Sequence, residues 1–463
     1  MKKKLCFLLG TYDDCRLLVE VVKLLPKQYE SIFLVYSLKA YNFVKELCLK
    51  VEYFSPKTKS FDDKSYVDFE KKYGIPNLRL IYNSDISLRN SEEKEAVQKV
   101  VNYILFFEEF FVHEKVDYLF YGTSGSLTER TAYVVAKRYK IPHFSSESGP
   151  MHRKETVVLC DVNENWIWSE MLKYYSALQK RELDTKEEVK LNSILLNFYD
   201  EGKMFKMCIE PSFKLIAKYA KGFLLYFFSQ KDSNVSLLNR VKDELSRCIR
   251  ISFIRLNKNF FSTFEPNKKY IFFPIHFIED SQITVRAPFF YNQFELVRQI
   301  ALSLPVGTLL YTKTHPDDLG GINIKKLKEL KKITGVKLLD PLEDSHKIIK
   351  NSLAVVSINS TAGWEAMLYK KPLIVIGDVF YKYQKDVIQV GDIRDMPFKI
   401  MEAIERKENF YDEKDWKKFI LSVVTTVGGG TIFKHYYDAP LESKNIEAFA
   451  KTIKNKLEDC DMH

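Results

Sequence analysis

Residues 353–376 read LAVVSINSTAGWEAMLYKKPLIVI, in which two short apolar runs flank a helical pattern. The runs at 353–358 and 373–376 are typical of strands that are buried on both faces of a parallel sheet. The pattern over 363–369 predicts a helix that carries the chain back to the next strand. The stretch therefore predicts a strand–helix–strand unit, which is the building block of an α/β fold with a parallel sheet.

The same alternation extends through much of the second half of the chain. We expect strands at 270–274, 309–312 and 336–338, and helices at 294–304, 324–334 and 344–350. Residues 266–440 are therefore predicted to form one Rossmann-like, doubly wound lobe.

An earlier part of the chain repeats this rhythm. We expect strands at 5–9, 31–36, 116–121 and 141–145, and helices at 15–25, 91–112 and 127–139. Residues 1–168 are thus predicted to form a first Rossmann-like lobe.

Two further segments complete the predicted organisation. Residues 169–265 lose the strand patterns and keep apolar residues at helical spacing, which predicts a helical insertion between the lobes. Residues 441–463 contain a last amphipathic helix. Loops at the carboxyl ends of both sheets are expected to face a shared cleft, where α/β proteins bind their ligands.

The composition fits a globular protein of two or three domains. The chain has 463 residues, of which 46% are hydrophobic and 29% charged. The net charge of +10 suits anionic small ligands or an anionic membrane face, and no nucleic-acid motif accompanies it. We therefore expect no nucleic-acid partner.

Cysteine usage and apolar runs indicate a cytoplasmic protein. The seven cysteines include no CxxC and no zinc spacing, so we expect reduced thiols and no zinc site. We also expect no other metal site and no cofactor. Residues 1–10 are typical of a buried strand rather than a signal peptide, and no uninterrupted apolar stretch reaches membrane-spanning length.

The segment that starts the helix after residue 358 predicts a phosphate site. Asn359, Ser360 and Thr361 lie at the expected helix start, with Gly363 in its first turn and Glu365 close behind. A helix N-terminus carries partial positive charge and free N–H groups, hydroxyls add donors, and glycine lets a phosphate approach the backbone. An ordinary N-cap without a ligand remains the alternative.

The loop after the strand at 309–312 predicts a second phosphate-binding element. Pro316 restricts His315 to an extended conformation at the strand end. The imidazole can donate a hydrogen bond to a phosphate, and Lys313 can supply a full positive charge. The alternative is a solvent-exposed loop histidine.

Carboxylates follow one strand in each lobe. His276 and Asp280 follow the strand at 270–274, and Glu147 follows the strand at 141–145. We predict Glu147 as the catalytic acid/base, Asp280 as a supporting carboxylate, and Arg153 as the partner of a carboxylate on a bound ligand. The alternatives are an N-cap for Asp280 and a solvated turn around Glu147.

Two weaker candidates complete the set. Thr123 and Ser124 lie in a small-residue turn of the first lobe, which either contacts the acceptor or only closes a turn. Residues 212–229 predict a helix with a basic stripe, for which packing is favoured over a membrane contact.

Taken together, the motifs resemble those of the capsule polysaccharide synthesis family. The resemblance runs from about 117 to 381 and is poor in the middle insertion. His276 stands where the family usually has Gln, and Pro150 where it often has an aromatic residue. The matching segments are Glu147-Ser-Gly149 with Arg153, Thr156-Val157 and Asn163, then Pro274-Ile-His276, Asp280-Ser-Gln-Ile283, Lys313-Thr-His-Pro316, Ser360 to Ala366, Lys371-Pro372 and Gly377 to Tyr381.

The resemblance implies the GT-B fold and a glycosyltransferase, because the family's characterised members are β-Kdo transferases that use CMP-Kdo. It implies transfer of an acidic, Kdo-like sugar from a CMP-sugar to a polysaccharide or glycolipid, with retained anomeric configuration. We expect no metal requirement, and a peripheral contact with the inner face of the cell membrane or with a capsule-assembly complex. The alternatives are a UDP-sugar transferase or UDP-GlcNAc 2-epimerase-like enzyme, and a non-catalytic capsule-assembly scaffold.

Overall fold

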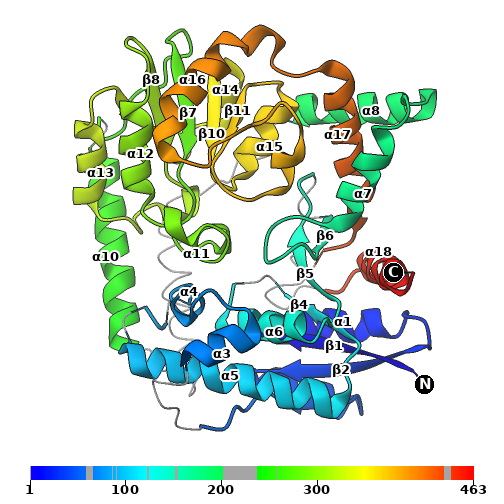
Figure 1. Cartoon of the computed structure of the whole chain (residues 1–463). Helices are drawn as coiled ribbons and strands as arrows, with labels where there is room; N and C mark the ends of the chain where they lie inside the picture. Colours follow the sequence, from blue (N-terminus) through cyan, green and yellow to red (C-terminus); the bar gives the residue numbers. More distant parts are fainter. Residues whose placement is uncertain are drawn as a thin grey trace.

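The computed structural model describes residues 2–58, 66–85, 87–89, 91–122, 125–151, 155–201, 237–257, 259–431 and 440–462. Two separate β-sheets, each covered by helices, form two α/β lobes (Figure 1). The predicted fold class, a GT-B arrangement of two Rossmann-like lobes, is confirmed.

The sheet of the first lobe has the strand order β13-β6-β5-β4-β1-β2-β3. Neighbouring strands from β5 to β3 run parallel, whereas β6 is antiparallel to both β5 and β13. The strands are β1 Lys3–Leu9, β2 Tyr29–Val35, β3 Val51–Tyr53, β4 Tyr118–Tyr121, β5 His143–Ser148, β6 Thr156–Cys160 and β13 Gly428–Gly429. The helices of this lobe are α1 Tyr12–Val22, α2 Leu38–Glu46, α3 Tyr66–Tyr73, α4 Leu78–Tyr82, α5 Glu93–Glu114 and α6 Leu127–Arg138.

The sheet of the second lobe has the order β12-β11-β10-β7-β8-β9, and all its strand pairs are parallel. The strands are β7 Tyr270–Pro274, β8 Leu309–Lys313, β9 Val336–Leu338, β10 Ala354–Ser357, β11 Leu373–Val375 and β12 Ile388–Gln389. The helices are α11 Ser281–Thr284, α12 Gln293–Leu302, α13 Ile324–Lys332, α14 Ser345–Asn351, α15 Thr361–Leu368, α16 Met396–Glu405 and α17 Glu413–Thr426.

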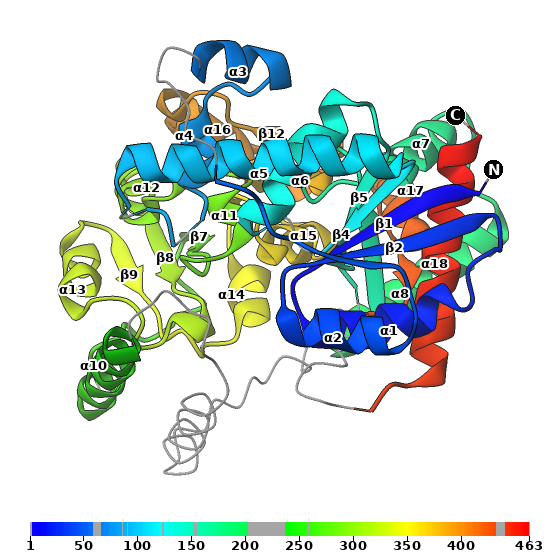
Figure 2. The ribbon, with the colours of Figure 1, turned by 90° about the horizontal axis from the view of Figure 1, so that it is seen from below.

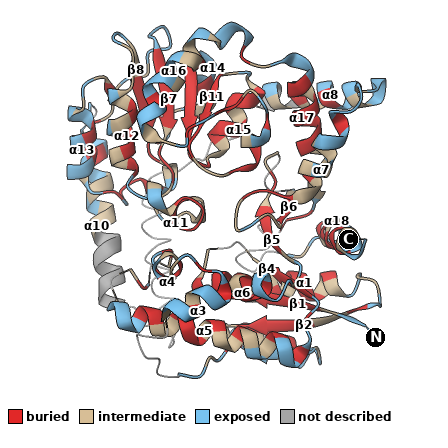
Figure 3. Ribbon diagram, in the orientation of Figure 1, coloured by how far each residue is buried: buried red, intermediate tan, exposed pale blue. Residues whose placement is uncertain are grey.

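Both sheets are buried on both faces, which explains the unbroken apolar runs in the sequence. In β10, Val355 packs into one hydrophobic cluster, and Ala354 and Val356 pack into another. Successive side chains of a strand point to opposite faces of the sheet, so a strand between two helical layers needs apolar residues at every position. Figure 3 shows the buried residues gathered along the strands of both sheets.

The described part of the middle segment is helical, as predicted. It consists of α7 Ser169–Leu178, α8 Thr185–Glu201 and α10 Leu237–Leu256. The helix that the sequence predicts at 212–229 lies outside the described residues.

The C-terminal part of the chain returns to the first lobe. The two glycines of β13 pair with β6, and helix α18, Ser443–Asp461, packs on the first sheet with Phe449 against Phe120, 6.3 Å between ring centroids. From the sequence we predicted that residues 266–440 all belong to the second lobe. This prediction is wrong for β13, which belongs to the sheet of the first lobe. Two glycines carry no apolar pattern, so nothing in the sequence signals their pairing.

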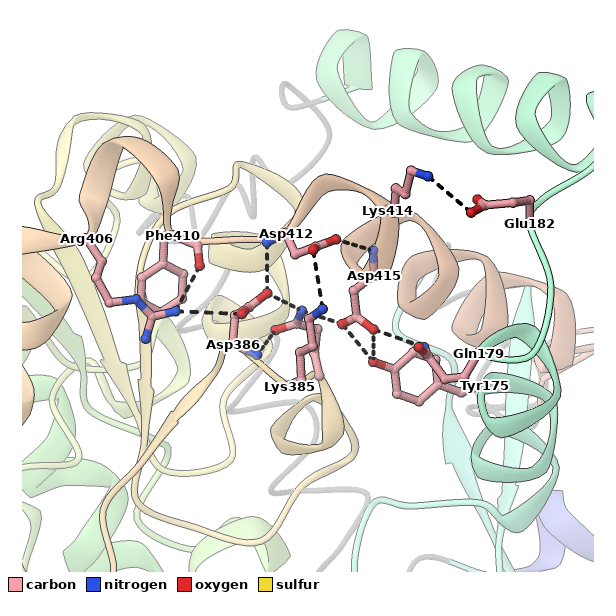
Figure 4. Close-up of polar contacts among 11 residues, drawn as sticks. Tyr175, Gln179, Glu182, Lys385, Asp386, Arg406, Phe410, Asp412, Lys414 and Asp415 are labelled. Carbon is pink, nitrogen blue, oxygen red and sulfur yellow. Dashed lines mark hydrogen bonds and ion pairs between the residues drawn. The ribbon is translucent and has the colours of Figure 1, made fainter.

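The buried carboxylate of Asp415 connects helix α17 with the C-terminal end of helix α7 (Figure 4). Asp415 of α17 is 4% exposed and accepts hydrogen bonds from the Tyr175 hydroxyl at 2.8 Å and the Gln179 side-chain amide at 2.9 Å. The Gln384 side chain donates to the same carboxylate at 2.9 Å. Three segments that are distant in sequence therefore meet at one side chain.

The described residues contain neither a membrane-spanning helix nor a disulfide. No helix among them is both long enough and apolar enough to cross a membrane. Their six cysteines form no disulfide, and Cys208 lies outside the described residues.

Candidate functional site

Loops from both lobes meet between the two sheets. The ring Nε2 of His276, after β7, lies 3.4 Å from the backbone N of Asn359, after β10. Asp280 is close enough to shift the pKa values of His276, Glu147 and Arg286 electrostatically. Because Glu147 belongs to the first lobe, candidate residues of both lobes share one neighbourhood.

Glu147 of β5 is buried and paired with an arginine from the opposite lobe. Its Oε1 accepts a hydrogen bond from Nη2 of Arg286, which follows α11. The Nε of Arg286 donates to the backbone carbonyl of Glu164 at 2.7 Å, so the guanidinium is held twice by the first lobe. Burial raises the pKa of the Glu147 carboxyl, although the nearby Arg286 charge acts to lower it.

Arg286 was not predicted from the sequence. It belongs to no motif that we recognised, and its partners Glu147 and Glu164 are 139 and 122 positions away. The only local indication is that it follows the segment with Asp280, which the sequence did place at the site.

His276 is a buried, structurally fixed histidine. Its backbone N donates to Oε1 of Gln293 at 2.8 Å, and its side chain lies among buried groups. Burial lowers its pKa to about 4, with His315 acting in the same direction and Asp280 opposing it. The imidazole is therefore neutral near pH 7, and because its Nε2 accepts a hydrogen bond from the Asn359 N–H, its proton lies on Nδ1.

Asn359 connects the β10–α15 loop to α11. Its side-chain amide donates to the backbone carbonyl of Gln282 at 3.0 Å. Its Oδ1 is buried and has no hydrogen-bond partner among the described residues. A Cβ on Gly377 would lie 2.1 Å from this oxygen, so the glycine is required for the close approach. An unsatisfied buried acceptor is costly and is commonly found at functional sites.

Asp280 has the structural role that the sequence left open. Its carboxylate caps α11 by accepting a hydrogen bond from the backbone N of Gln282 at 3.0 Å. Its half-buried side chain still influences Glu147 and His276 electrostatically.

Lys313 differs from the prediction. Its ammonium donates hydrogen bonds to the backbone carbonyls of Pro341 at 3.1 Å and Glu343 at 2.5 Å. Two of its three N–H donors are therefore bound to the loop after β9. Burial lowers its pKa, while Glu365 and Asp344 act to raise it. The side chain is held inside the lobe and is not a free cation at the loop tip.

His315 caps a short 3-10 helix, Pro316–Asp318, in the extended conformation that the sequence predicted, with φ −62° and ψ 142°. Its Nδ1 accepts a hydrogen bond from the backbone N of Asp317 at 3.2 Å. In the neutral ring this leaves the proton on Nε2. Its side chain is 40% exposed, so the solvated-loop alternative also describes part of its surroundings.

The loop that carries His315 is fixed by α10. Arg247 donates to the backbone carbonyls of Asp317 at 2.9 Å and Leu319 at 3.2 Å, and Arg250 donates to that of Gly320 at 2.5 Å. The helical segment between the lobes therefore has a positioning role.

Asp318, in the same loop, was missed by the sequence analysis. It is 6% exposed, and its Oδ2 has no partner among the described residues. Burial raises its pKa to about 7, helped by Glu279 and Asp317 and opposed by Arg247 and a hydrogen bond from the backbone of Ile278. This last contact ties the loop after β8 to the loop after β7.

The start of α15 is capped by Ser360, as the sequence allowed. Its Oγ accepts a hydrogen bond from the backbone N of Ala362 at 3.1 Å, and its carbonyl accepts one from the Tyr381 hydroxyl at 2.8 Å. A Cβ on Gly363 would lie 2.6 Å from the Tyr381 ring. Close packing by Tyr381, rather than the approach of a ligand, therefore explains this glycine, which corrects the reason given from the sequence.

The remaining candidates and cavities lie elsewhere. Thr123, Ser124 and Arg153 are outside the described residues. Within the described ranges, no three His, Cys, Asp or Glu side chains are grouped as in a metal site. Two surface cavities of about 380 and 340 Å³ lie between α10 and α13 and beside α3 to α5, and neither includes the residues above.

Comparison with known proteins supports the resemblance seen in the sequence. Residues 247–385 match the family described as capsule polysaccharide biosynthesis protein. This segment includes the loops with His276, His315 and Ser360, whereas Glu147 lies outside it. No curated protein matches the chain.

Several solved structures align along most of the chain with low TM-scores. KpsC from Thermosulfurimonas dismutans, a β-Kdo 2,7 transferase, is 13% identical over 92% of this chain and 99% of that one, with TM-score 0.35. A UDP-GlcNAc 2-epimerase from Neisseria meningitidis bound to UDP-GlcNAc is 12% identical over 98% and 100%, with TM-score 0.33. MnaA of S. aureus with UDP is 14% identical over 99% and 97%, with TM-score 0.32.

Proposed function

We propose that this chain is a glycosyltransferase of capsular or surface polysaccharide biosynthesis, which transfers an acidic, Kdo-like sugar from a CMP-sugar to a polysaccharide or glycolipid. One observation carries the proposal. The segment that matches the capsule family supplies His276, His315 and Ser360, and its Arg286 meets Glu147 of the other lobe. Two lobes that contribute to one site are suited to bringing a donor and an acceptor together.

The donor nucleotide would bind to the second lobe. Its phosphate would lie at the start of α15, near Ser360 and Thr361, where helix N–H groups favour an anion. His315 would add a hydrogen bond from Nε2, and Glu365 would contact the ribose. These groups would stabilise the leaving nucleotide without a metal ion.

Glu147 is our candidate for the acid/base, and Arg286 controls its availability. A carboxylate paired with a buried guanidinium is a poor base, so catalysis requires the pair to separate or Arg286 to change partner. The carboxylate of an acidic sugar offers Arg286 such a partner, because guanidinium and carboxylate match geometrically. Among the described residues, Arg286 is thus suited to bind the sugar carboxylate, the role that we predicted for Arg153 from the sequence.

Ligand-dependent stabilisation and direct transfer assays test the proposal. CMP should raise the melting temperature, because a ligand stabilises the state that it binds, and CMP-Kdo should be consumed with a capsule-type acceptor. Stabilisation by UDP alone would replace the donor assignment with a UDP-sugar transferase or an epimerase-like enzyme. No stabilisation by either nucleotide and no transfer would favour a non-catalytic scaffold.

A further inference from the structure

A row of exposed apolar side chains runs along α10. Ile249, Phe253 and Leu256 are 70%, 37% and 84% exposed. Their spacing of four and three residues places them on one face of the helix. Ile254, between them, is buried and packs into the core of the second lobe. The helix is therefore anchored by one side and presents an apolar stripe with the other.

Helix α13 adds a cluster of positive charge next to this stripe. The two helices lie side by side at the edge of the molecule opposite α18 (Figures 1 and 2). Their shared cavity of about 380 Å³ is lined by Phe253 and Phe260 together with Lys328, Lys331 and Lys332. The Nζ of Lys328 lies 5.1 Å from the centre of the Phe253 ring, so charge and apolar surface are in direct contact.

The lysines of α13 are available for an external anion. The helix has five lysines and one glutamate, and it packs inward through Leu327 and Leu330. Over the described residues, none of these lysines forms an ion pair with a carboxylate. Lys331 donates to the backbone carbonyls of Asn259 and Phe260, which leaves Lys328 and Lys332 as the exposed charges beside the stripe.

We propose that Ile249, Phe253, Leu256, Lys328 and Lys332, here called the α10–α13 patch, bind the surface of an anionic phospholipid membrane. The lysines would contact lipid phosphates, and the apolar side chains would enter the boundary between headgroups and acyl chains. The exposed aliphatic side chains favour a membrane over a soluble acidic polymer, which would leave Ile249 and Leu256 in water. This inference does not depend on the reaction proposed above.

Vesicle co-sedimentation of the full chain tests the patch. Binding is expected to vesicles of phosphatidylcholine with phosphatidylglycerol, to be at least fivefold weaker to phosphatidylcholine alone, and to fall when salt is raised from 0.1 to 0.5 M. The variants Ile249→Ser with Leu256→Ser and Lys328→Glu with Lys332→Glu should each reduce binding at least fivefold.

Matched controls carry the same changes at exposed positions outside the patch. Val306→Ser with Phe398→Ser changes two apolar side chains that are 107% and 74% exposed, and Lys27→Glu with Lys451→Glu changes two exposed lysines of the first lobe. Both control proteins should bind like the wild type. The proposal is overturned if the wild-type chain does not bind anionic vesicles, if it binds neutral vesicles equally well, or if the patch variants bind as strongly as the controls.

Discussion

The Glu147 carboxylate of the first lobe accepts a hydrogen bond from the Arg286 guanidinium of the second lobe, and both side chains are buried. Removing one member of a buried ion pair leaves the other charge without compensation. The pair therefore contributes to the contact between the lobes, and the Arg286 charge opposes the rise that burial causes in the pKa of the carboxylate that we assign to catalysis.

Replacing Arg286 by Met should lower the free energy of unfolding by about 3 kcal/mol, because Glu147 would remain buried without its cation. The loss should be larger at pH 8 than at pH 5. Without Arg286 the pKa of Glu147 in the folded state rises further above its value in the unfolded state. Over a wider pH range the folded chain then keeps a proton that the unfolded chain has released, so the variant loses more stability as the pH rises. Urea denaturation at both pH values measures the effect.

The exposed pair Arg298–Glu295 provides the control for this experiment. Arg298→Met should change the free energy of unfolding far less than Arg286→Met does, because solvent screens an exposed ion pair. Equal effects of the two substitutions would show that the Glu147–Arg286 contact is not a buried bridge in solution.

Glu147→Gln should still fold, although with lower stability because the buried Arg286 loses its counter-charge, and should lose transfer activity by about 10² to 10⁴-fold, the usual contribution of an acid/base group. His315→Ala should reduce turnover by about 10²-fold, because one donor to the leaving phosphate is lost. Circular dichroism and turnover with CMP-Kdo check both expectations. His113→Ala, an exposed histidine on α5, serves as the control, and turnover like the control in either variant would remove that residue from the mechanism.

Asp318 should make the protein less stable as the pH rises. Burial raises the pKa of this carboxyl from 3.8 to about 7. Between these two pKa values the unfolded chain has released the proton that the folded chain keeps. The contribution of Asp318 to the free energy of unfolding therefore falls by at most about 1.4 kcal/mol per pH unit. Asp318→Asn should abolish that slope in denaturation experiments from pH 4.5 to 7.5. Asp68→Asn, at an exposed position of α3, should keep it.

Asp415→Ala should destabilise the protein by about 3 kcal/mol, because three side-chain donors would lose a charged, buried acceptor. Asp415→Asn keeps the shape and one acceptor oxygen, so its loss should be smaller. Thermal unfolding of the two variants and of the wild type measures the loss of stability in each variant. An effect of Asp415→Ala below about 1 kcal/mol would contradict the role assigned to the contacts in Figure 4.

The sequence predicted those parts of the site that depend on neighbouring residues. The apolar run of β10 and the capping preference of Ser360 lie within a few positions of each other, so strand, turn and helix start could be placed correctly. The same holds for His315, whose extended conformation follows from Pro316. In each case the physical cause acts along the chain over one turn of structure.

Features that arise from packing between distant segments could not be predicted. Arg286 is important only because the folded chain brings it to Glu147. Asp318 has a raised pKa because the fold buries it, and Glu279 adds to this rise while Arg247 of α10 opposes it. Lys313 followed a motif, yet the loop after β9 takes up two of its N–H donors. Residue type and order gave no information about these partners.

The contact between Gly363 and Tyr381 allows a direct test of how α15 is held. Alanine is favoured over glycine within a helix by about 1 kcal/mol, so Gly363→Ala would be stabilising if the helix propensity alone mattered. The structure leads to the opposite expectation, because the added Cβ would lie 2.6 Å from the Tyr381 ring and would displace the hydroxyl that donates to Ser360. We expect Gly363→Ala to cost about 2 kcal/mol, as overpacking commonly does.

A double-mutant cycle separates this clash from other effects. In a Tyr381→Ala background the space is open, so Gly363→Ala should become neutral or stabilising, and the coupling between the two positions should exceed about 1 kcal/mol. Gly391→Ala is the matched control, because a Cβ there meets nothing within 4 Å. If Gly363→Ala costs the same with and without the Tyr381 ring, the glycine is not required by that ring, and the approach of a ligand becomes the better explanation for it.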